Sequence, residues 1–395
     1  MNKTLLVLGA GVYQVPTIET GARLGYRVIT TDNVPGNPGH VLASAAFDID
    51  TTDVPGVLDL ARRERVSGVI APCTDVALLT AAHVSEHLHL PGPPVSAAYV
   101  LTQKFRFREF LREAGFDSPR AFLVEQGRLP PEVLFDGRAW LIKPNRSSGS
   151  KGIFVLSLAE EFLTHVADSQ SFSADGTAVL EEFMDGTQHT CEGVLKQGRV
   201  AVALVTDRDT APTPHTATTG HRVPSRLTEA VQNSAIRLIE RAFNRLLVTS
   251  GPFDCDFLVK SGGITLIEMT PRLGGNSLCQ LSKAALDFDL VAYAVRHACG
   301  DPYELPEFRQ PKPRSISILG VEGCGRLTWN EIEMHALRGE AWVESLILDL
   351  PQGSPVKPFI NGRCRVGEAL IAGSDRNELD IRAEELRRRL ALAAA

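Results

Sequence analysis

Short apolar runs alternate with helix-length amphipathic segments over the first 95 residues. The run KTLLVLGAG ends in glycines, VPTIETGARLG has the length of a helix and closes at Gly25, and YRVITTDN is a second apolar run that ends at Asp32. A further run at 68–73 precedes the helical stretch DVALLTAAHVSEHLHL. Strands that alternate with helices predict β-α-β units, so we expect a parallel, doubly wound sheet in an N-terminal domain over 1–95.

A different pattern begins after the Pro/Gly-rich segment PGPPV, with the helix TQKFRFREFLREAG. From about 120 to 205, the runs RAFLV, AWLIKP, GIFVL, AVLEEFM and HTCEGVL have few helices between them, which predicts an antiparallel module. The stretch RLTEAVQNSAIRLIERAFNRL has helical periodicity, and two strands, DCDFLVK and ITLIEMT, follow it. The tail predicts a small α/β cap that ends in a charged amphipathic helix. The predicted segments are 1–95, 96–205, 206–310 and 311–395.

Composition and charge narrow the class of protein. A chain of 395 residues is too long for one ordinary core, and its formal net charge of −6 argues against an extended basic surface for nucleic acid. The seven cysteines are scattered and never form C-x-x-C, which is typical of free thiols in a reducing compartment. The N-terminal apolar run is too short for a signal peptide, and no run of about 18 apolar residues follows. We therefore expect a cytoplasmic protein with small-molecule partners and no membrane or nucleic-acid partner.

Two motifs match known chemistry only in part. GAGVYQ resembles a dinucleotide-binding turn with Asp32 as the ribose-binding acid, but Gln14 occupies the third glycine position that allows close packing beneath a pyrophosphate. We expect this turn to serve helix packing or a different small ligand. HVSEH, at 83–87, matches the H-x-x-E-H zinc pattern but lies in an alanine-rich helix of the N-terminal domain. We interpret it as solvated helix surface.

The stretch AWLIKPNRSSGSKGIFVL, at 139–156, places Lys143 on a strand and follows it with a loop of small polar residues. Glycine and serine allow backbone N–H groups to point at phosphate oxygens, and Lys143 adds a positive charge from a fixed position. The spacing is not that of a P-loop, and the loop joins two strands instead of opening a helix. We predict a mobile flap over phosphates at 144–152, with an ordinary Ser/Gly turn as the alternative.

Carboxylates lie at the ends of later strands. VLEEFMDG carries Glu181 and Glu182 into a turn, which favours an adenine-binding segment or, alternatively, a charged strand end. In FDCDFLVKSGGITLIEMTPR, KSGG predicts a hairpin turn, and Asp256 precedes Glu268 by 12 residues (268 − 256), so both can face the same side. Two carboxylates near a phosphate flap describe a Mg²⁺ site. Arg272 would hold an anionic substrate or a developing phosphate charge, with a salt bridge at the rim as the alternative.

In this order, the motifs resemble the ATP-grasp superfamily: a glycine turn, a lysine near the start of the central domain, LIKP with its flap, LEEF, and a carboxylate strand followed by E-x-x-P-R. The segment VTDRDTAPTPHTATTGHRVPSRL, at 205–227, is similar to the L-amino-acid ligase branch and to carboxylate–amine ligases with a carbamoyl-phosphate-synthase-like middle. The resemblance implies an ATP-grasp fold of mixed α/β and α+β domains behind the doubly wound N-terminal sheet. It also implies ATP with Mg²⁺, or Mn²⁺ in its place, and a homodimer as a common assembly.

The resemblance assigns a role to each matched position. Catalytic roles fall to Arg272, Lys143 and His221, and Glu192 matches a position on the substrate side. Glu181 would meet the adenine amino group, and Gln188 the ribose. The implied ATP contacts are Lys104, Lys143, Ser147, Ser148, Gly149, Lys151, Gly152, Glu181, Glu182, Met184 and Gln188, and the implied metal ligands are Asp256, Glu268 and Thr270. Thr270 replaces the asparagine usual in the family and is a weaker ligand, and Asp256 is shorter than the commoner glutamate.

Such a site supports a two-step acyl transfer. A carboxylate attacks the γ-phosphate of ATP to give an acyl-phosphate and ADP, and an amine then displaces phosphate. Positioning and electrostatics suffice, and the sequence shows no Ser-His-Asp or Cys-His arrangement. Three alternatives remain: a bicarbonate-using carboxylase or carbamoyl-phosphate-type enzyme, an oxidoreductase on the N-terminal domain, and a non-catalytic nucleotide sensor.

Overall fold

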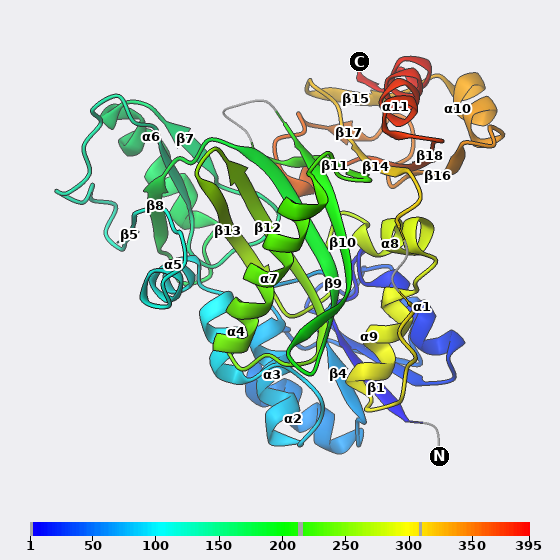
Figure 1. Cartoon of the computed structure of the whole chain (residues 1–395). Coiled ribbons are helices and arrows are strands. Elements are labelled where there is room, and N and C mark those ends of the chain that lie inside the picture. Colours follow the sequence, from blue (N-terminus) through cyan, green and yellow to red (C-terminus); the bar gives the residue numbers. More distant parts are fainter. Residues whose placement is uncertain (1–2, 212–215, 308–309) are drawn as a thin grey trace.

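The computed structural model describes residues 3–211, 216–307 and 310–395. Its N-terminal part contains the strands β1 (Thr4–Leu8), β2 (Arg27–Thr31), β3 (Ala45–Phe47) and β4 (Gly68–Ile70), all parallel in the order β3-β2-β1-β4. The helices are α1 (Val15–Arg23), α2 (Val54–Arg63) and α3 (Leu78–His87), and the 3-10 turn η1 (His40–Leu42) precedes β3. This sheet is the parallel one that the apolar runs predict (Figure 1).

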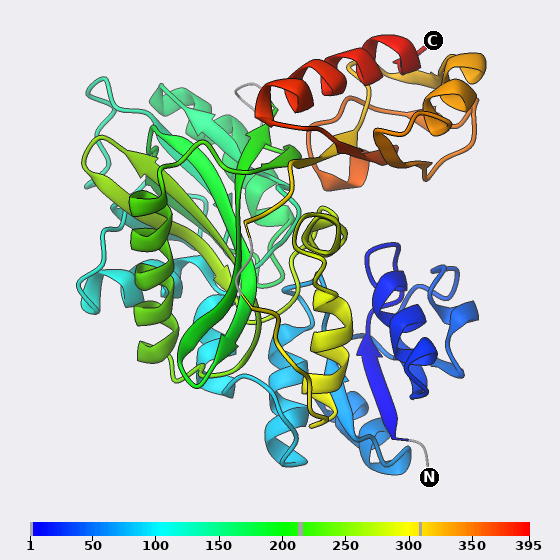
Figure 2. The same cartoon turned by 45° about the vertical axis from the view of Figure 1, so that its right-hand side comes forward.

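Alternate residues of β1 face two different cores, which is the mark of a doubly wound sheet. Leu6 and Leu8 pack with α2 and α3, whereas Leu5 and Val7 pack with α1 and with the distant helix α9 (Leu290–Ala298). Figure 2 shows α9, in yellow, between the blue N-terminal strand and the green central sheet. The N-terminal segment therefore shares a core with residues almost 300 positions later.

A small antiparallel sheet follows the helices α4 (Val95–Leu101) and α5 (Lys104–Glu113). Its strands, β5 (Ala121–Val124), β6 (Trp140–Pro144), β7 (Phe154–Leu156) and β8 (Ala178–Glu182), lie in the order β5-β8-β6-β7. Helix α6 (Ala159–Ser171) covers one face through Phe162 and Val166, which pack against Trp140 and Ile142. The predicted flap joins β6 to β7 and so extends from the rim of this sheet.

The largest sheet is antiparallel and has the order β13-β12-β9-β10-β11-β14-β18-β16. Its strands are β9 (Thr187–Lys196), β10 (Arg199–Thr210), β11 (Thr218–Val223), β12 (Gly251–Lys260), β13 (Gly263–Thr270), β14 (Arg314–Leu319), β16 (Val343–Leu348) and β18 (Gly367–Ala372). Helix α7 (Glu229–Arg245) packs its apolar side on one face. Helix α8 (Leu278–Leu286) covers part of the other face, beside Leu204 and Val223.

This sheet departs from the predicted segments in two ways. The boundary at 205 falls inside β10, because β10 pairs with β9 and β9 pairs with β12, so both strands belong to the large sheet and not to the small one. Strands β14, β18 and β16 of the expected C-terminal cap continue the same sheet through β11. Hydrophobic patterns identify strands, but they do not say which sheet a strand joins, since both sheets here are antiparallel.

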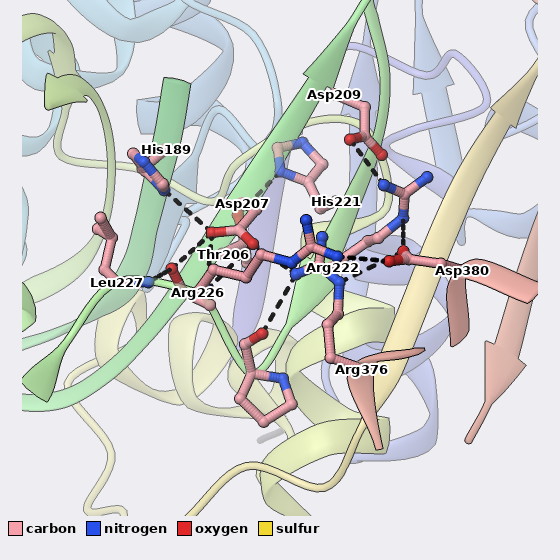
Figure 3. Close-up of polar contacts among 12 residues, drawn as sticks. His189, Thr206, Asp207, Asp209, His221, Arg222, Arg226, Leu227, Arg376 and Asp380 are labelled. Carbon is pink, nitrogen blue, oxygen red and sulfur yellow. Dashed lines mark hydrogen bonds and ion pairs between the residues drawn. The ribbon is translucent and has the colours of Figure 1, made fainter. Parts of the chain in front are cut away.

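The rest of the C-terminal part comprises β15 (Gly325–Thr328), α10 (Glu331–Arg338), β17 (Pro355–Val356), the 3-10 turn η2 (Gly362–Cys364), α11 (Arg376–Leu390) and β19 (Ala393–Ala394). A polar network fastens α11 to β10 and β11 (Figure 3). Asp207 accepts hydrogen bonds from Arg376 and from Ser225 Oγ at 2.6 Å, and Asp380 lies 2.7 Å from Arg226 and 3.4 Å from Arg222. Among the described residues, no helix is both long and apolar enough to cross a membrane.

Candidate active site

A cleft of about 510 Å³ lies between the small sheet, the large sheet, the N-terminal domain and the turn η2. Thirteen of the predicted site residues line it: Lys104, Lys143, Ser147, Ser148, Gly149, Lys151, Glu181, Glu182, Met184, Gln188, Asp256, Glu268 and Arg272. The structure thus brings together residues that lie up to 168 positions apart (272 − 104). The roles assigned to them stay predictions.

A buried ionic triad forms one wall of the cleft. Lys143 Nζ lies 2.5 Å from Glu181 Oε1, and Arg108 Nε donates to Glu181 Oε2 at 2.8 Å. Each of the three residues is at most 4% exposed. Burial opposes the charge of Glu181, but Arg108 and Lys143 outweigh it and lower its pKa to about 2. Burial lowers the pKa of Lys143 to about 8, although Glu181 acts in the opposite direction.

The triad gives Glu181 a structural role. Both of its oxygens accept hydrogen bonds from buried cations, so the carboxylate holds Lys143 in place, while its contact with an adenine amino group stays a prediction. Arg108 has no counterpart among the predicted site residues. A sequence offers little signal for it, because it is one of three arginines in the charged helix α5 and only the fold shows which of them is buried.

The predicted carboxylate hairpin forms in the expected register. Strands β12 and β13 pair antiparallel with Asp256 directly opposite Glu268, and a bulge follows between Asp256 and Phe257. Side chains of directly opposed residues project to the same face of a sheet. Arg208 Nη1 lies 2.6 Å from Asp256 Oδ2, and Lys104 Nζ lies 3.1 Å from Glu268 Oε1. Burial opposes the charge of Glu268, but Lys104 and Lys143 lower its pKa on balance.

The donor chemistry of this pair fits Mg²⁺ or Mn²⁺. Two carboxylates supply hard oxygen ligands, and such ions commonly complete their coordination with substrate phosphates and water. Within the described ranges, no group of three or more His, Cys, Asp or Glu side chains is arranged to hold a metal unaided. A metal site built from Asp256 and Glu268 therefore needs the phosphates of a bound nucleotide as further ligands. In the protein alone, Lys104 balances the charge of Glu268 and Arg208 that of Asp256.

Arg272 follows β13 and points into the cleft beneath the N-terminal domain. Its Nη2 lies 2.7 Å from Asp75 Oδ1, its Nη1 donates to Leu273 O at 2.7 Å, and Nη1 lies 3.8 Å from Asp254 Oδ2. Asp75, in the loop between β4 and α3, thus fixes the guanidinium from another domain. Burial opposes the charge of Arg272, but Asp75 and Asp254 outweigh it and raise its pKa, so it stays cationic.

The flap contacts both of its neighbours. Lys104 Nζ donates to Ser147 O at 2.8 Å, and the backbone of Gly362 in η2 donates to Gly149 O at 3.1 Å. Gly149 and Ser150 have φ of 75° and 54°, which explains a glycine at the first position. Burial, and then Arg363 and Lys104, lower the pKa of Lys151.

Four residues that the resemblance places at the site lie outside the cleft lining: Gly152, Glu192, His221 and Thr270. Phe172 and Pro144 fill the space beside Gly152, so this glycine allows the chain to pack closely at the base of the flap. His221 is 1% exposed on β11, and its Nδ1 is 3.0 Å from Thr206 Oγ1. Burial and Arg208 lower the pKa of His221 to about 3, so its imidazole is uncharged at neutral pH, and the catalytic role implied for it stays a prediction. Thr270 is buried beside Asp254, one row behind Asp256 and Glu268.

The N-terminal motifs also receive a structural explanation. The Gln14 side chain lies beside Gly9, and its Nε2 donates to Pro72 O at 2.7 Å, so the residue at the third glycine position packs within its own domain. Asp32 accepts hydrogen bonds from Ala10 N and Asn37 Nδ2 within its own domain. The two histidines of HVSEH lie on α3, with His87 exposed.

Sequence reasoning missed five charged residues of the cleft: Asp75, Asp185, Arg208, Asp254 and Arg363. Asp254 had a usable signal, since it precedes Asp256 by two positions on a predicted strand and must share its face. Its pKa lies well above the usual range because of burial, and burial likewise raises that of Glu192 to about 7. The charge of Glu192 further raises the pKa of Asp254.

Comparison with known proteins supports the resemblance to ATP-grasp proteins. Residues 138–280 match the model of the ATP-grasp domain. The chain is similar to carnosine synthase 1 of Gallus gallus (27% identity, covering 81% of this chain and 37% of that protein). It is also similar to formate-dependent phosphoribosylglycinamide formyltransferase of Burkholderia mallei (26%, 96% and 93%). The chain spans only 59% of a further relative, an uncharacterized protein of Sinorhizobium fredii.

Among solved structures, L-amino acid ligase from Bacillus licheniformis superimposes with a TM-score of 0.83 over 100% of this chain and 98% of that one, at 19% sequence identity. An identity this low speaks for the fold alone. The matched domain includes β6, the flap, the buried triad lysine and the carboxylate hairpin. Residues 138–280 of the chain therefore form an ATP-grasp domain.

Proposed function

We propose that the protein is an ATP-dependent carbon–nitrogen ligase, which activates a carboxylate as an acyl-phosphate and couples it to an amine. One observation carries this proposal: Asp256 and Glu268 face each other across β12 and β13, with Lys104 on Glu268 and Lys143 in the same cleft beneath the flap. Such an arrangement suits a nucleotide polyphosphate and a divalent ion. The similarity to L-amino acid ligase and carnosine synthase 1 supports amino acids as substrates.

The residues of the chain would divide the work by position. Lys143, held by Glu181, and Lys104, at the first turn of α5, would neutralise phosphate oxygens. Backbone groups of Glu182 to Met184 would meet the adenine ring, and Gln188 at the start of β9 the ribose. When bound, Mg²⁺ on Asp256 and Glu268 would offset the negative charge of the β- and γ-phosphates.

Two displacements complete the reaction. An oxygen of the acid attacks the γ-phosphorus, the bond from that phosphorus to the β–γ bridging oxygen breaks, and ADP leaves. The amine nitrogen then attacks the acyl carbon, the carbon–oxygen bond to phosphate breaks, and the displaced protons pass to solvent or phosphate. Arg272, fixed by Asp75, would stabilise the anionic acyl-phosphate between these steps. The flap would exclude the water that hydrolyses this intermediate.

The test is a screen for product. The protein is incubated with ATP, Mg²⁺ and pairs from a panel of small acids and amino acids, and ADP, phosphate and condensed products are measured by mass spectrometry. We expect at least one pair to give an amide with equal ADP. Asp256→Asn should lower the rate at least 100-fold, whereas Asp117→Asn should retain it, because Asp117 contacts the far end of the same hairpin through Lys260.

The same screen separates the remaining alternatives. ADP formation that requires bicarbonate would favour a carboxylating enzyme. ATP binding without ADP in any mixture would favour a nucleotide sensor. Either result, obtained with protein that binds ATP, would refute the amide-forming proposal.

A further inference from the structure

Behind the two carboxylates proposed to hold a metal lies a second polar row on the same face of the large sheet. Glu192 on β9 pairs with Asp254 on β12, and Asp254 pairs with Thr270 on β13. Directly opposed residues of neighbouring strands share a face and lie about 5 Å apart at Cβ. The row is therefore continuous across three strands, and Asp254 is its member that lines the cleft.

The row contains acceptors that lack donors. Among the described residues, Asp254 Oδ1, Glu192 Oε2 and Thr270 Oγ1 have no hydrogen-bond partner. Glu192 and Thr270 are 1% and 2% exposed, so these are costly atoms to leave unpaired. A Cβ at Gly274 would overlap Glu192 Oε2 and lie 3.1 Å from Asp254 Cγ, which shows that the two carboxyl groups converge over a residue without a side chain.

The position of the row suits the second substrate of the proposed ligase. Asp254 Oδ2 lies 3.8 Å from Nη1 of Arg272, the residue proposed to hold the acyl-phosphate. Asp254 and Asp256 are two residues apart on one strand, which corresponds to about 6.7 Å. A group bound at Asp254 would thus lie beside the acyl carbon and one step removed from the γ-phosphate.

The ligand that fits is a monovalent nitrogen cation. An ammonium group offers three N–H donors and no acceptor, which complements several acceptors that lack donors. A second divalent ion fits less well, because the guanidinium of Arg272 lies close by and Glu192 already accepts hydrogen bonds from Gly274 N and Cys279 Sγ. We propose that Asp254, with Thr270 beside it and Glu192 behind it, binds the ammonium group of the amine substrate.

This assignment rests on the proposed function and moves Thr270 from the metal site to the amine site. It identifies the second substrate as one that arrives protonated, as an amino acid or alkylamine does at neutral pH, and that passes one proton to the Asp254 carboxylate before the nitrogen lone pair attacks the acyl carbon. An amide, an aromatic amine or ammonia bound as the neutral molecule would gain nothing from Asp254.

The experiment compares a neutral with a charged nucleophile. Hydroxylamine, uncharged at pH 7.5, traps an acyl-phosphate as the hydroxamate, whereas ethylamine, ethanolamine and the common amino acids are protonated at that pH. For Asp254→Asn we expect hydroxamate formation and the KM for ATP within about twofold of the parent. The KM for the protonated amine should rise about 10- to 100-fold, as loss of one charge-assisted hydrogen bond predicts. Thr270→Val should raise it less, and Asp256→Asn should abolish both products.

Two results would overturn the proposal. An unchanged amine KM in Asp254→Asn would mean that the row holds only water or balances Arg272. An equal loss of hydroxamate and amide would place Asp254 in the activation step. If the parent protein forms neither product, the ligase proposal fails on its own. Calorimetric titration with ethylammonium chloride then still tests the ammonium site, because the affinity for ethylammonium must fall at least tenfold in Asp254→Asn. Mn²⁺ binding that is lost in Asp254→Asn but kept in Asp256→Asn would make the row a metal site instead.

Discussion

Replacing Glu181 with glutamine should be far more destabilising than the same change one residue later. Glu181 is 3% exposed and is the shared counterion of Lys143 and Arg108, which are themselves 4% and 3% exposed. Glutamine keeps the shape and one acceptor but leaves two buried cations facing each other. Breaking a buried ion pair costs about 3–5 kcal/mol, and we expect about 3 kcal/mol here because the amide oxygen still accepts one hydrogen bond.

Glu182→Gln is the matched control. Its carboxylate is 25% exposed and lies 3.7 Å from Arg120 and 3.5 Å from Arg138, both on the surface. Exposed pairs of this kind contribute about 0–1 kcal/mol. Urea unfolding followed by circular dichroism at pH 7 measures both variants. Equal midpoints for the two would refute the view that the triad is a buried, interdependent unit.

The pH dependence of the same pair gives an independent check. The pKa of Glu181 is about 2 in the folded protein and about 4.3 in an unfolded chain. A carboxylate whose pKa is lowered by folding stabilises the protein fully above its unfolded pKa, and this contribution is lost as the pH falls towards the folded value. The difference between parent and Glu181→Gln should therefore be constant between about pH 5 and 7, where Lys143 is also charged, and shrink between about pH 4 and 2. A difference that grows on acidification would contradict the assignment.

Three further outcomes are expected. Because burial places the pKa of Lys143 at about 8, ATP affinity should fall about tenfold between pH 7 and pH 9, measured by equilibrium dialysis; a flat profile would mean that Lys143 does not contact the nucleotide as a cation. Gly274→Ala should destabilise the protein by about 1–3 kcal/mol in urea, since its Cβ would overlap Glu192 Oε2, and Gly275→Ala, with open space at that position, is the control. Arg376→Ala removes the cation on Asp207 and should make the C-terminal part more sensitive to limited proteolysis, while an unchanged digestion pattern would show that the network of Figure 3 is dispensable.

Local chemistry in the sequence predicted much of this site, and the reasons are physical. KSGG sets a hairpin turn, and alternation along β12 and β13 then fixes Asp256 and Glu268 on one face. Lys143 and the flap follow from a strand that ends in small polar residues. Each of these features depends only on residues that lie within about 20 positions of one another.

The parts that could not be predicted depend on long-range packing. Asp75 meets Arg272 across 197 positions, and Arg108 meets Glu181 across 73. The sequence pattern of either segment does not identify the contact partner. An arginine in an amphipathic helix gives the same pattern whether its side chain faces solvent or a buried carboxylate. The sequence likewise did not predict the eight-stranded sheet. Its strands from the C-terminal part are amphipathic runs that would suit a separate small sheet equally well.

The two polar rows suggest why one face of a single sheet can order a two-substrate reaction. Under the proposed assignments, successive positions on β12 meet successive groups: Asp256 the ion on the phosphates, and Asp254 the ammonium of the amine, beside Arg272. The pleat sets the separation, because side chains on one face recur every two residues, or about 6.7 Å. The strand itself would therefore hold the amine and the phosphates at neighbouring positions on one face of the sheet. Inserting one residue between Asp254 and Asp256 would turn one of the two rows to the opposite face of the sheet. This insertion should abolish amide formation even though both carboxylates remain in the chain.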